Sequence, residues 1–144
     1  DPCHRKGGGI VQDRTIYEDT IFARMHRDDG LMPDRDWDTY ITHFHVMQGF
    51  LRYPDVILYL RCSPTRAAER IQTRGRSVEK EIPIAYLESL NAGYEEFVQE
   101  MKQYTIVVEL DCYEFLPTED VVAAIREATE SRTAQKFLRS LRRI

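Results

Sequence analysis

The sequence predicts an α/β fold in which helices cover both faces of a parallel sheet. Short, β-branched apolar runs predict three buried strands, at residues 10–12, 56–60 and 105–110. Amphipathic stretches predict helices over residues 16–26, 34–50, 64–73, 83–104 and 117–131. Strands that alternate with helices are typical of parallel sheets, and ligands bind such sheets at the carboxyl ends of the strands.

Local start signals support several of these helices. Ser63-Pro64 and Ile82-Pro83 place proline where the first turn of a helix tolerates it, and Pro33 precedes an acidic first turn. A basic amphipathic stretch over residues 133–144 predicts a separate last helix. We expect this helix to be solvated or packed against a partner rather than bound to nucleic acid.

Length and charge limit the possible functions. The chain has 144 residues, enough for one compact domain, so residues 1–144 are treated as a single unit. A net charge of −4 argues against a general nucleic-acid or membrane-surface binder, because both need a net basic field. No apolar run approaches the length of a membrane span. Three cysteines without metal-binding spacing fit a reducing compartment, the cytoplasm or the mitochondrial matrix.

A charged triplet, Asp13-Arg14-Thr15, follows the first predicted strand. It would bring a carboxylate, a guanidinium and a hydroxyl to the carboxyl ends of the strands, and these groups suit a phosphate and a hydroxyl as ligands. The alternative is a buried Asp13–Arg14 pair with a helix N-cap by Thr15 or Asp13. The triplet alone does not decide between them.

A second group of arginines lies on and after the helix predicted at residues 64–73. Arg70 and Arg74 are four residues apart and share a helix face, and Arg76 follows the helix-ending Gly75. Arginine stays charged and binds phosphate oxygens through a bidentate fork, so the three guanidiniums could converge on one anion. The alternative is a solvated basic face paired with Glu69 and Glu79.

These segments together resemble the deoxynucleoside kinases, which transfer the γ-phosphate of ATP to the 5′-hydroxyl of a deoxynucleoside. The resemblance covers about residues 9–98, and two separated motifs match in order and spacing. The matching residues are Asp13-Arg14-Thr15, Tyr17, Asp19, Phe22, Arg70, Arg74-Gly75-Arg76, Glu79, Ile82-Pro83 and Tyr86. The resemblance implies a three-layer P-loop kinase-like fold with ATP and Mg²⁺ as cofactors and a homodimer paired through helices near residues 34–50.

On the acceptor side, the resemblance implies that Arg14 works near the 5′-hydroxyl and the transferred phosphate, with Asp13 beside it. Asp19 would hydrogen-bond the edge of the base, and Phe22 would stack on the base. Helical periodicity alone would instead make Phe22 an ordinary core residue.

Around the donor and the sugar, the resemblance implies that Arg70, Arg74 and Arg76 are the arginines of a lid over the phosphates. Glu79 and Tyr86 would hold the 3′-hydroxyl of the sugar. The family's adenine-gripping turn follows its last strand, where this chain has residues 111–115, but that turn does not align residue by residue.

The chain departs from the family at the phosphate loop. The loop has the pattern G-x-x-x-x-G-K-[ST], and this sequence contains no Gly-Lys dipeptide. Gly7-Gly8-Gly9 follows Lys6 and leads into a predicted strand, so it is not a disguised phosphate loop. The glutamate that serves the family as general base is also missing. We therefore expect these residues to belong to a longer chain that supplies the missing N-terminal strands.

Two other functions match part of this pattern. One is a non-catalytic kinase-like subunit of a larger complex, and the other is a thymidylate-type nucleotide kinase. Retention of Glu79 and the three lid arginines favours an enzyme over a docking subunit. Thymidylate-type kinases accept a nucleoside monophosphate, and the Glu79 and Tyr86 arrangement fits a nucleoside better.

Overall fold

The computed structural model describes residues 9–76 and 82–141, with side chains as far as residue 132. Seven elements follow one another along the described chain: α2 (Ile16–Asp28), α3 (Asp34–Gln48), β1 (Val56–Arg61), α4 (Pro64–Arg74), α5 (Ile84–Met101), β2 (Ile106–Asp111) and α6 (Thr118–Leu141). The predicted α/β fold with a parallel sheet is confirmed.

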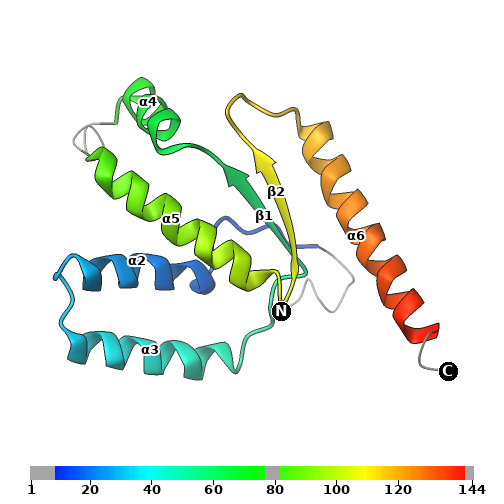
Figure 1. Cartoon of the computed structure of the whole chain (residues 1–144), viewed down its shortest axis with the longest axis horizontal. Helices are drawn as coiled ribbons and strands as arrows, with labels where there is room; N and C mark the ends of the chain where they lie inside the picture. Colours follow the sequence, from blue (N-terminus) through cyan, green and yellow to red (C-terminus); the bar gives the residue numbers. More distant parts are fainter. Residues whose placement is uncertain (1–8, 77–81, 142–144) are drawn as a thin grey trace.

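The sheet of the described chain consists of β1 and β2, which pair in parallel from Val56 opposite Ile106 to Arg61 opposite Asp111. The connection between the two strands runs through α4 and α5. Figure 1 shows α5 on one side of the sheet and α6 on the other, with α2 and α3 beyond α5. Both strands therefore end at the same edge, and the segments that follow them lie together.

The core lies between the sheet and α5 and between α5 and α2. Val98 and Met101 of α5 and Val108 of β2 are buried, as are Tyr17 and Ile21 of α2. Gly93 allows the two helices to approach, because a Cβ atom at this position would lie 2.6 Å from Cγ2 of Ile21.

The predicted strand at residues 10–12 is wrong for the described chain, which has no strand there. Ile10 is half exposed and Val11 is fully exposed. A strand needs a neighbour to pair its backbone groups, and no strand of the described chain pairs with this segment. The triplet at residues 13–15 therefore follows an irregular segment.

The predicted break before the last helix is also wrong. Helix α6 continues from Thr118 to Leu141, so residues 117–131 and the described part of residues 133–144 form one helix. The sequence between Ser131 and Ala134 contains neither glycine nor proline, so nothing local interrupts the backbone hydrogen bonds.

Candidate functional site

Residues 13–15 lead into α2 through a capping box. The Thr15 hydroxyl accepts a hydrogen bond from the Tyr17 amide at 3.3 Å, and the Glu18 carboxylate accepts one from the Thr15 amide. The sequence left the cap open between Thr15 and Asp13, and the structure assigns it to Thr15. Asp13 and Arg14 are both exposed, so the structure contradicts the alternative of a buried pair.

Arg14 has an unusual backbone. Its φ angle of 62° lies in the left-handed region that favours glycine. Its guanidinium carbon lies 5.0 Å from the centroid of the Phe22 ring, within cation–π range. A non-glycine residue in this region costs about 1–3 kcal/mol, and such strain often occurs at functional sites. The structure thus brings together two residues predicted to meet the acceptor, one for its 5′-hydroxyl and one for its base.

Phe22 belongs to an aromatic cluster between α2, α5 and β1. Its ring meets that of Tyr94 edge to face at 6.4 Å between centroids, and Tyr94 stacks on Tyr59 at 6.2 Å. Burial raises the pKa of Tyr94, and the nearby Arg14 charge opposes that shift. The sequence analysis did not identify Tyr94, because only the packing of α5 against α2 brings it to Phe22.

Asp19 lies on α2, three residues before Phe22, and its side chain is exposed. This spacing places the carboxylate and the ring on neighbouring positions of one helix face. An exposed carboxylate beside an aromatic ring can accept hydrogen bonds from an exocyclic amine while the ring stacks on the base.

Helix α4 begins at the predicted residue and ends one residue later than predicted, at Arg74. The Ser63 hydroxyl accepts a hydrogen bond from the Arg66 amide at 3.2 Å, Pro64 is the first residue of α4, and Arg74 is the last. Gly75 caps the helix with a left-handed φ of 70°, which suits glycine because it has no Cβ. The local signals were therefore sufficient to place the arginines on and just beyond this helix.

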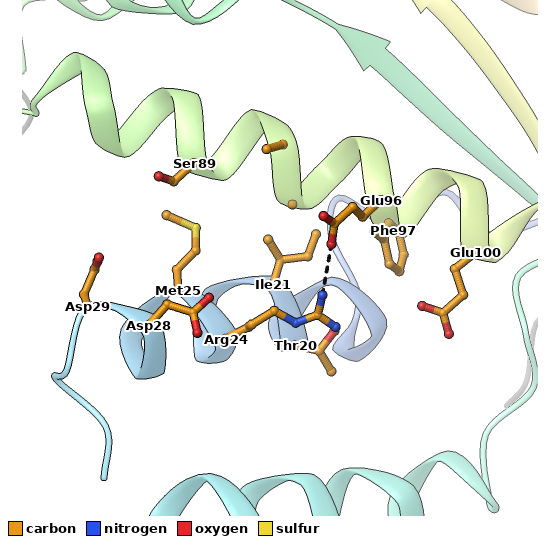
Figure 2. Close-up of a pocket in the computed structure, with 12 residues that line it drawn as sticks. Thr20, Ile21, Arg24, Met25, Asp28, Asp29, Ser89, Glu96, Phe97 and Glu100 are labelled. Carbon is orange, nitrogen blue, oxygen red and sulfur yellow. Dashed lines mark hydrogen bonds and ion pairs between the residues drawn. The ribbon is translucent and has the colours of Figure 1, made fainter. Parts of the chain in front are cut away.

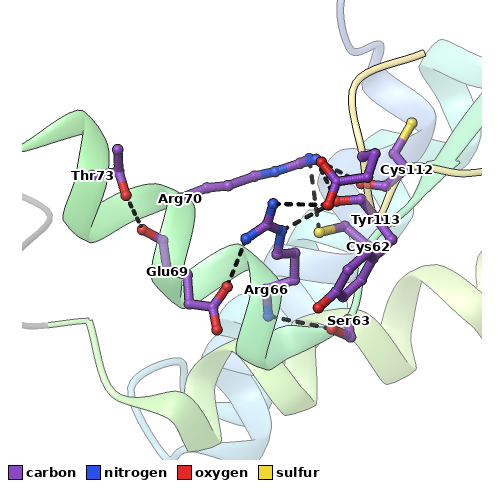
Figure 3. Close-up of polar contacts among 9 residues, drawn as sticks. Cys62, Ser63, Arg66, Glu69, Arg70, Thr73, Cys112 and Tyr113 are labelled. Carbon is purple, nitrogen blue, oxygen red and sulfur yellow. Dashed lines mark hydrogen bonds and ion pairs between the residues drawn. The ribbon is translucent and has the colours of Figure 1, made fainter.

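The predicted lid arginines differ in position. Nη2 of Arg70 donates to the carbonyl oxygens of Cys112 at 2.7 Å and Tyr113 at 3.1 Å, so this guanidinium contacts the segment after β2 (Figure 3). Arg74 lies at the end of α4 and Arg76 just beyond Gly75, and both are exposed. Convergence of all three on one anion stays a prediction.

Tyr86 and Glu79 were predicted to hold the sugar. Tyr86 lies in the first turn of α5 and is partly buried, and its amide donates to the Pro83 carbonyl at 3.1 Å. Glu79 lies outside the described residues. Their common role therefore stays a prediction.

A charged network that the sequence analysis missed joins the sheet to α5. Arg61 makes a two-point contact with Glu95, with Nε–Oε1 and Nη2–Oε2 distances of 2.9 and 3.0 Å, and Nη2 also lies 2.7 Å from Oε2 of Glu109. The hydroxyl of Tyr59 donates to Glu95 at 3.2 Å. Hydrogen bonding from Arg61 lowers the pKa of Glu95, and burial, followed by the Glu95 charge, raises the pKa of Tyr59 to about 12.

A groove of about 360 Å³ runs between α2 and α5 (Figure 2). None of the predicted site residues lines it. Its acidic side chains are Asp28, Asp29, Glu96 and Glu100, and its one arginine, Arg24, is paired with Glu96 at 3.1 Å. The excess of carboxylates would repel a phosphate, so this groove is not the candidate site.

Residues 9–76 and 82–141 contain no group of three or more His, Cys, Asp or Glu side chains that could hold a metal ion. None of the helices within these ranges is long and apolar enough to cross a membrane.

Comparisons with known proteins identify the family of the chain. The family profile described as "Deoxynucleoside kinase" matches residues 2–131. The chain is 42% identical to a deoxyadenosine kinase of Dictyostelium discoideum, over 85% of this chain and 50% of that protein. It is 37% identical to a deoxyadenosine/deoxycytidine kinase of Bacillus subtilis (strain 168), over 83% of this chain and 57% of that protein.

A similar solved structure is that of deoxyadenosine kinase from M. mycoides with bound dCTP. It has a TM-score of 0.68 and 32% identity, and the match covers 82% of this chain and 62% of that one. The chain thus spans about half the length of the curated relatives it matches. The family match over most of the chain shows that the chain belongs to the deoxynucleoside kinase family.

Proposed function

We propose that the protein transfers the γ-phosphate of ATP to the 5′-hydroxyl of a deoxynucleoside. The contact between Arg14 and Phe22 carries this proposal, because it sets an anion-binding group against a ring able to stack on a base. Phosphoryl transfer depends on positioning and on neutralising charge spread over the phosphate oxygens, and arginine can do both. The names of the relatives make deoxyadenosine and deoxycytidine the first substrates to test.

In this proposal, Arg14 neutralises charge on the transferred phosphate, and Asp13 lies beside the acceptor hydroxyl. Phe22 stacks on the base, and Asp19 accepts a hydrogen bond from the edge of the base. Arg70, Arg74 and Arg76 cover the donor phosphates, and Glu79 and Tyr86 hold the 3′-hydroxyl. Mg²⁺ is expected from the family resemblance alone. Residues 9–76 and 82–141 contain no group of three or more His, Cys, Asp or Glu side chains that could hold a metal ion, so no residue of this part of the chain is assigned to Mg²⁺.

We also propose that an upstream segment completes the enzyme with the phosphate loop, the general base and further strands. Within the described chain, β1 has one unpaired edge, and Leu58 and Leu60 are 36% and 49% exposed on one of its faces. The buried Tyr17 hydroxyl has no hydrogen-bond partner among the described residues, and such groups nearly always have one. A preceding segment would pair with the open edge of β1, cover the two leucines and bond the Tyr17 hydroxyl.

A homodimer and a cytoplasmic or mitochondrial-matrix location complete the proposal. Exposed apolar side chains near the end of α3 and just after it support pairing through this region: Val46, Met47, Phe50 and Leu51. The mass of the purified protein in solution tests the dimer.

The decisive experiment uses the protein expressed from its complete reading frame. Its intact mass and N-terminal sequence show whether a segment precedes Asp1. Incubation with ATP and each of the four natural deoxynucleosides then tests the activity. Formation of a deoxynucleoside 5′-monophosphate, greatest with deoxyadenosine or deoxycytidine, is the expected result. A native chain that begins at Asp1, or one that forms no product, would refute the catalytic proposal and favour the non-catalytic subunit.

A further inference from the structure

Two arginines fasten α4 to the segment that joins β2 to α6 (residues 112–117, the β2–α6 loop). Arg66 and Arg70 lie one turn apart on α4 and both reach this loop (Figure 3). Arg70 was predicted from the family resemblance, whereas Arg66 belongs to none of the motifs that carry it. The contacts of Arg66 are therefore a feature of this chain that the proposed function does not explain.

Arg66 makes four contacts with its guanidinium. Nε donates to the Tyr113 carbonyl at 3.1 Å, and Nη2 lies 3.4 Å from Oε1 of Glu114. Nη1 donates to Glu69 on its own helix at 2.8 Å. The guanidinium carbon also lies 5.1 Å from the centroid of the Tyr113 ring. The side chain is 28% exposed, so the planar group links α4 to both the backbone and the side chains of the loop.

These contacts fix the orientation of two peptide groups. Arg66 and Arg70 both bond the Tyr113 carbonyl, and Arg70 also bonds that of Cys112, so both carbonyls point toward α4. In a trans peptide the N–H points opposite to the C=O. The Tyr113 and Glu114 amides therefore point away from α4. Tyr113 and Phe115 are exposed residues, at 63% and 96%.

The loop also occupies a ligand-binding position in the fold. It follows the carboxyl end of β2, where open parallel sheets bind ligands, and it faces the helix that carries the predicted lid arginines. Exposed aromatic rings beside oriented amides can bind a flat, hydrogen-bonding group such as a nucleotide base.

We propose that Arg66 is a positioning residue that holds the β2–α6 loop in the geometry needed to bind the base of the phosphate donor. This inference rests on the proposed kinase function. Arg66 acts through the loop and does not touch the reacting atoms. Its loss should weaken donor binding and leave acceptor binding intact.

The test compares Arg66→Ala, Arg66→Lys and Arg35→Ala in the protein from its complete reading frame. Arg35 is a matched control, since its side chain is 93% exposed and pairs with the neighbouring Asp36 at 3.6 Å. We expect Arg66→Ala to raise the KM for ATP about tenfold, the scale of one charge-assisted hydrogen bond. The KM for the deoxynucleoside should match the control. Arg66→Lys should raise the KM for ATP less than Arg66→Ala does, because an ammonium group keeps the charge but lacks the several N–H donors of a guanidinium.

An equal change in both KM values, or no change in either, would overturn the positioning role. Absence of turnover in the parent protein would refute the kinase function instead. In that case amide hydrogen exchange of the loop decides whether Arg66 anchors it. Exchange that is faster in Arg66→Ala than in Arg35→Ala supports the anchoring, and equal exchange contradicts it.

Discussion

Arg14 combines a strained backbone with the charge that the proposed reaction needs. Glycine adopts a φ of 62° without steric cost, whereas arginine and alanine do not. The protein thus keeps a side chain that the local backbone disfavours. This combination allows stability and function to be separated at one position.

We predict that Arg14→Gly and Arg14→Ala lower turnover to a similar degree, because both remove the guanidinium. The glycine variant should be more stable than the alanine variant by about 1 kcal/mol, since it alone relieves the strain. Denaturant unfolding and steady-state kinetics of the two variants check this. Near-normal turnover in either variant would remove Arg14 from the proposed mechanism.

Tyr59 provides a second test at the scale of one residue. Its pKa rises from 10 in the unfolded chain to about 12, chiefly through burial. The folded state therefore holds the phenolic proton more tightly, and this contribution is complete below pH 10 and is lost as the pH rises toward 12.

We predict that the free energy of unfolding falls more steeply between pH 10 and 12 in the parent than in Tyr59→Phe, by about 1–2 kcal/mol in total. Urea unfolding at several pH values measures the slopes. Parallel slopes in parent and variant would show that Tyr59 titrates normally.

Among the elements, the contact between α2 and α5 depends on Gly93. Alanine is a better helix former than glycine by about 1 kcal/mol, so Gly93→Ala would stabilise an isolated helix. Here the added methyl group would lie 2.6 Å from Cγ2 of Ile21, a buried β-branched side chain with few alternative rotamers.

We predict that Gly93→Ala destabilises the protein by about 1–3 kcal/mol, the usual cost of overpacking. The double variant Ile21→Val with Gly93→Ala should not regain stability, because valine keeps the Cγ2 methyl. Ile21→Ala with Gly93→Ala should be more stable than Ile21→Ala alone. Thermal unfolding of the four variants measures the coupling, and additive effects would mean that the two helices adjust freely.

The elements also show what a sequence can specify. Helices α2 and α4 were predictable because their signals are local, namely the amphipathic pattern of residues 16–26 and the Ser63 and Gly75 caps of α4. The strand expected at residues 10–12 failed because a strand depends on a partner that local sequence does not provide.

The same distinction applies to the candidate site. Arg14 and Phe22 are eight residues apart in the sequence, and the family resemblance predicted a role for both. The contacts of Tyr94 with Phe22 and of Arg66 with Tyr113 join distant elements, so they needed the packed fold. Spacing and composition do not specify which residues come into contact when distant elements pack together.

At the scale of the whole molecule, the sheet presents an unpaired β1 edge and a partly exposed face at Leu58 and Leu60. Edges of this kind pair readily with other chains. A segment that pairs with β1 would remove the edge and bury both leucines.

We predict that residues 1–144 alone unfold at a lower temperature and self-associate more readily than the protein from the complete reading frame. Thermal unfolding and light scattering at several protein concentrations measure both. Equal melting temperatures and a monomeric short chain would show that the sheet needs no further strand.

The parallel pairing of β1 with β2 also has a consequence for how the protein is made. β1 leaves the ribosome before α4, α5 and β2, so its main partner in the described sheet does not yet exist. Closing the long crossover before the strands can pair is entropically costly, and such non-local pairing slows folding. The edge of β1 that pairs with β2 therefore stays open for the whole time that α4 and α5 are synthesised.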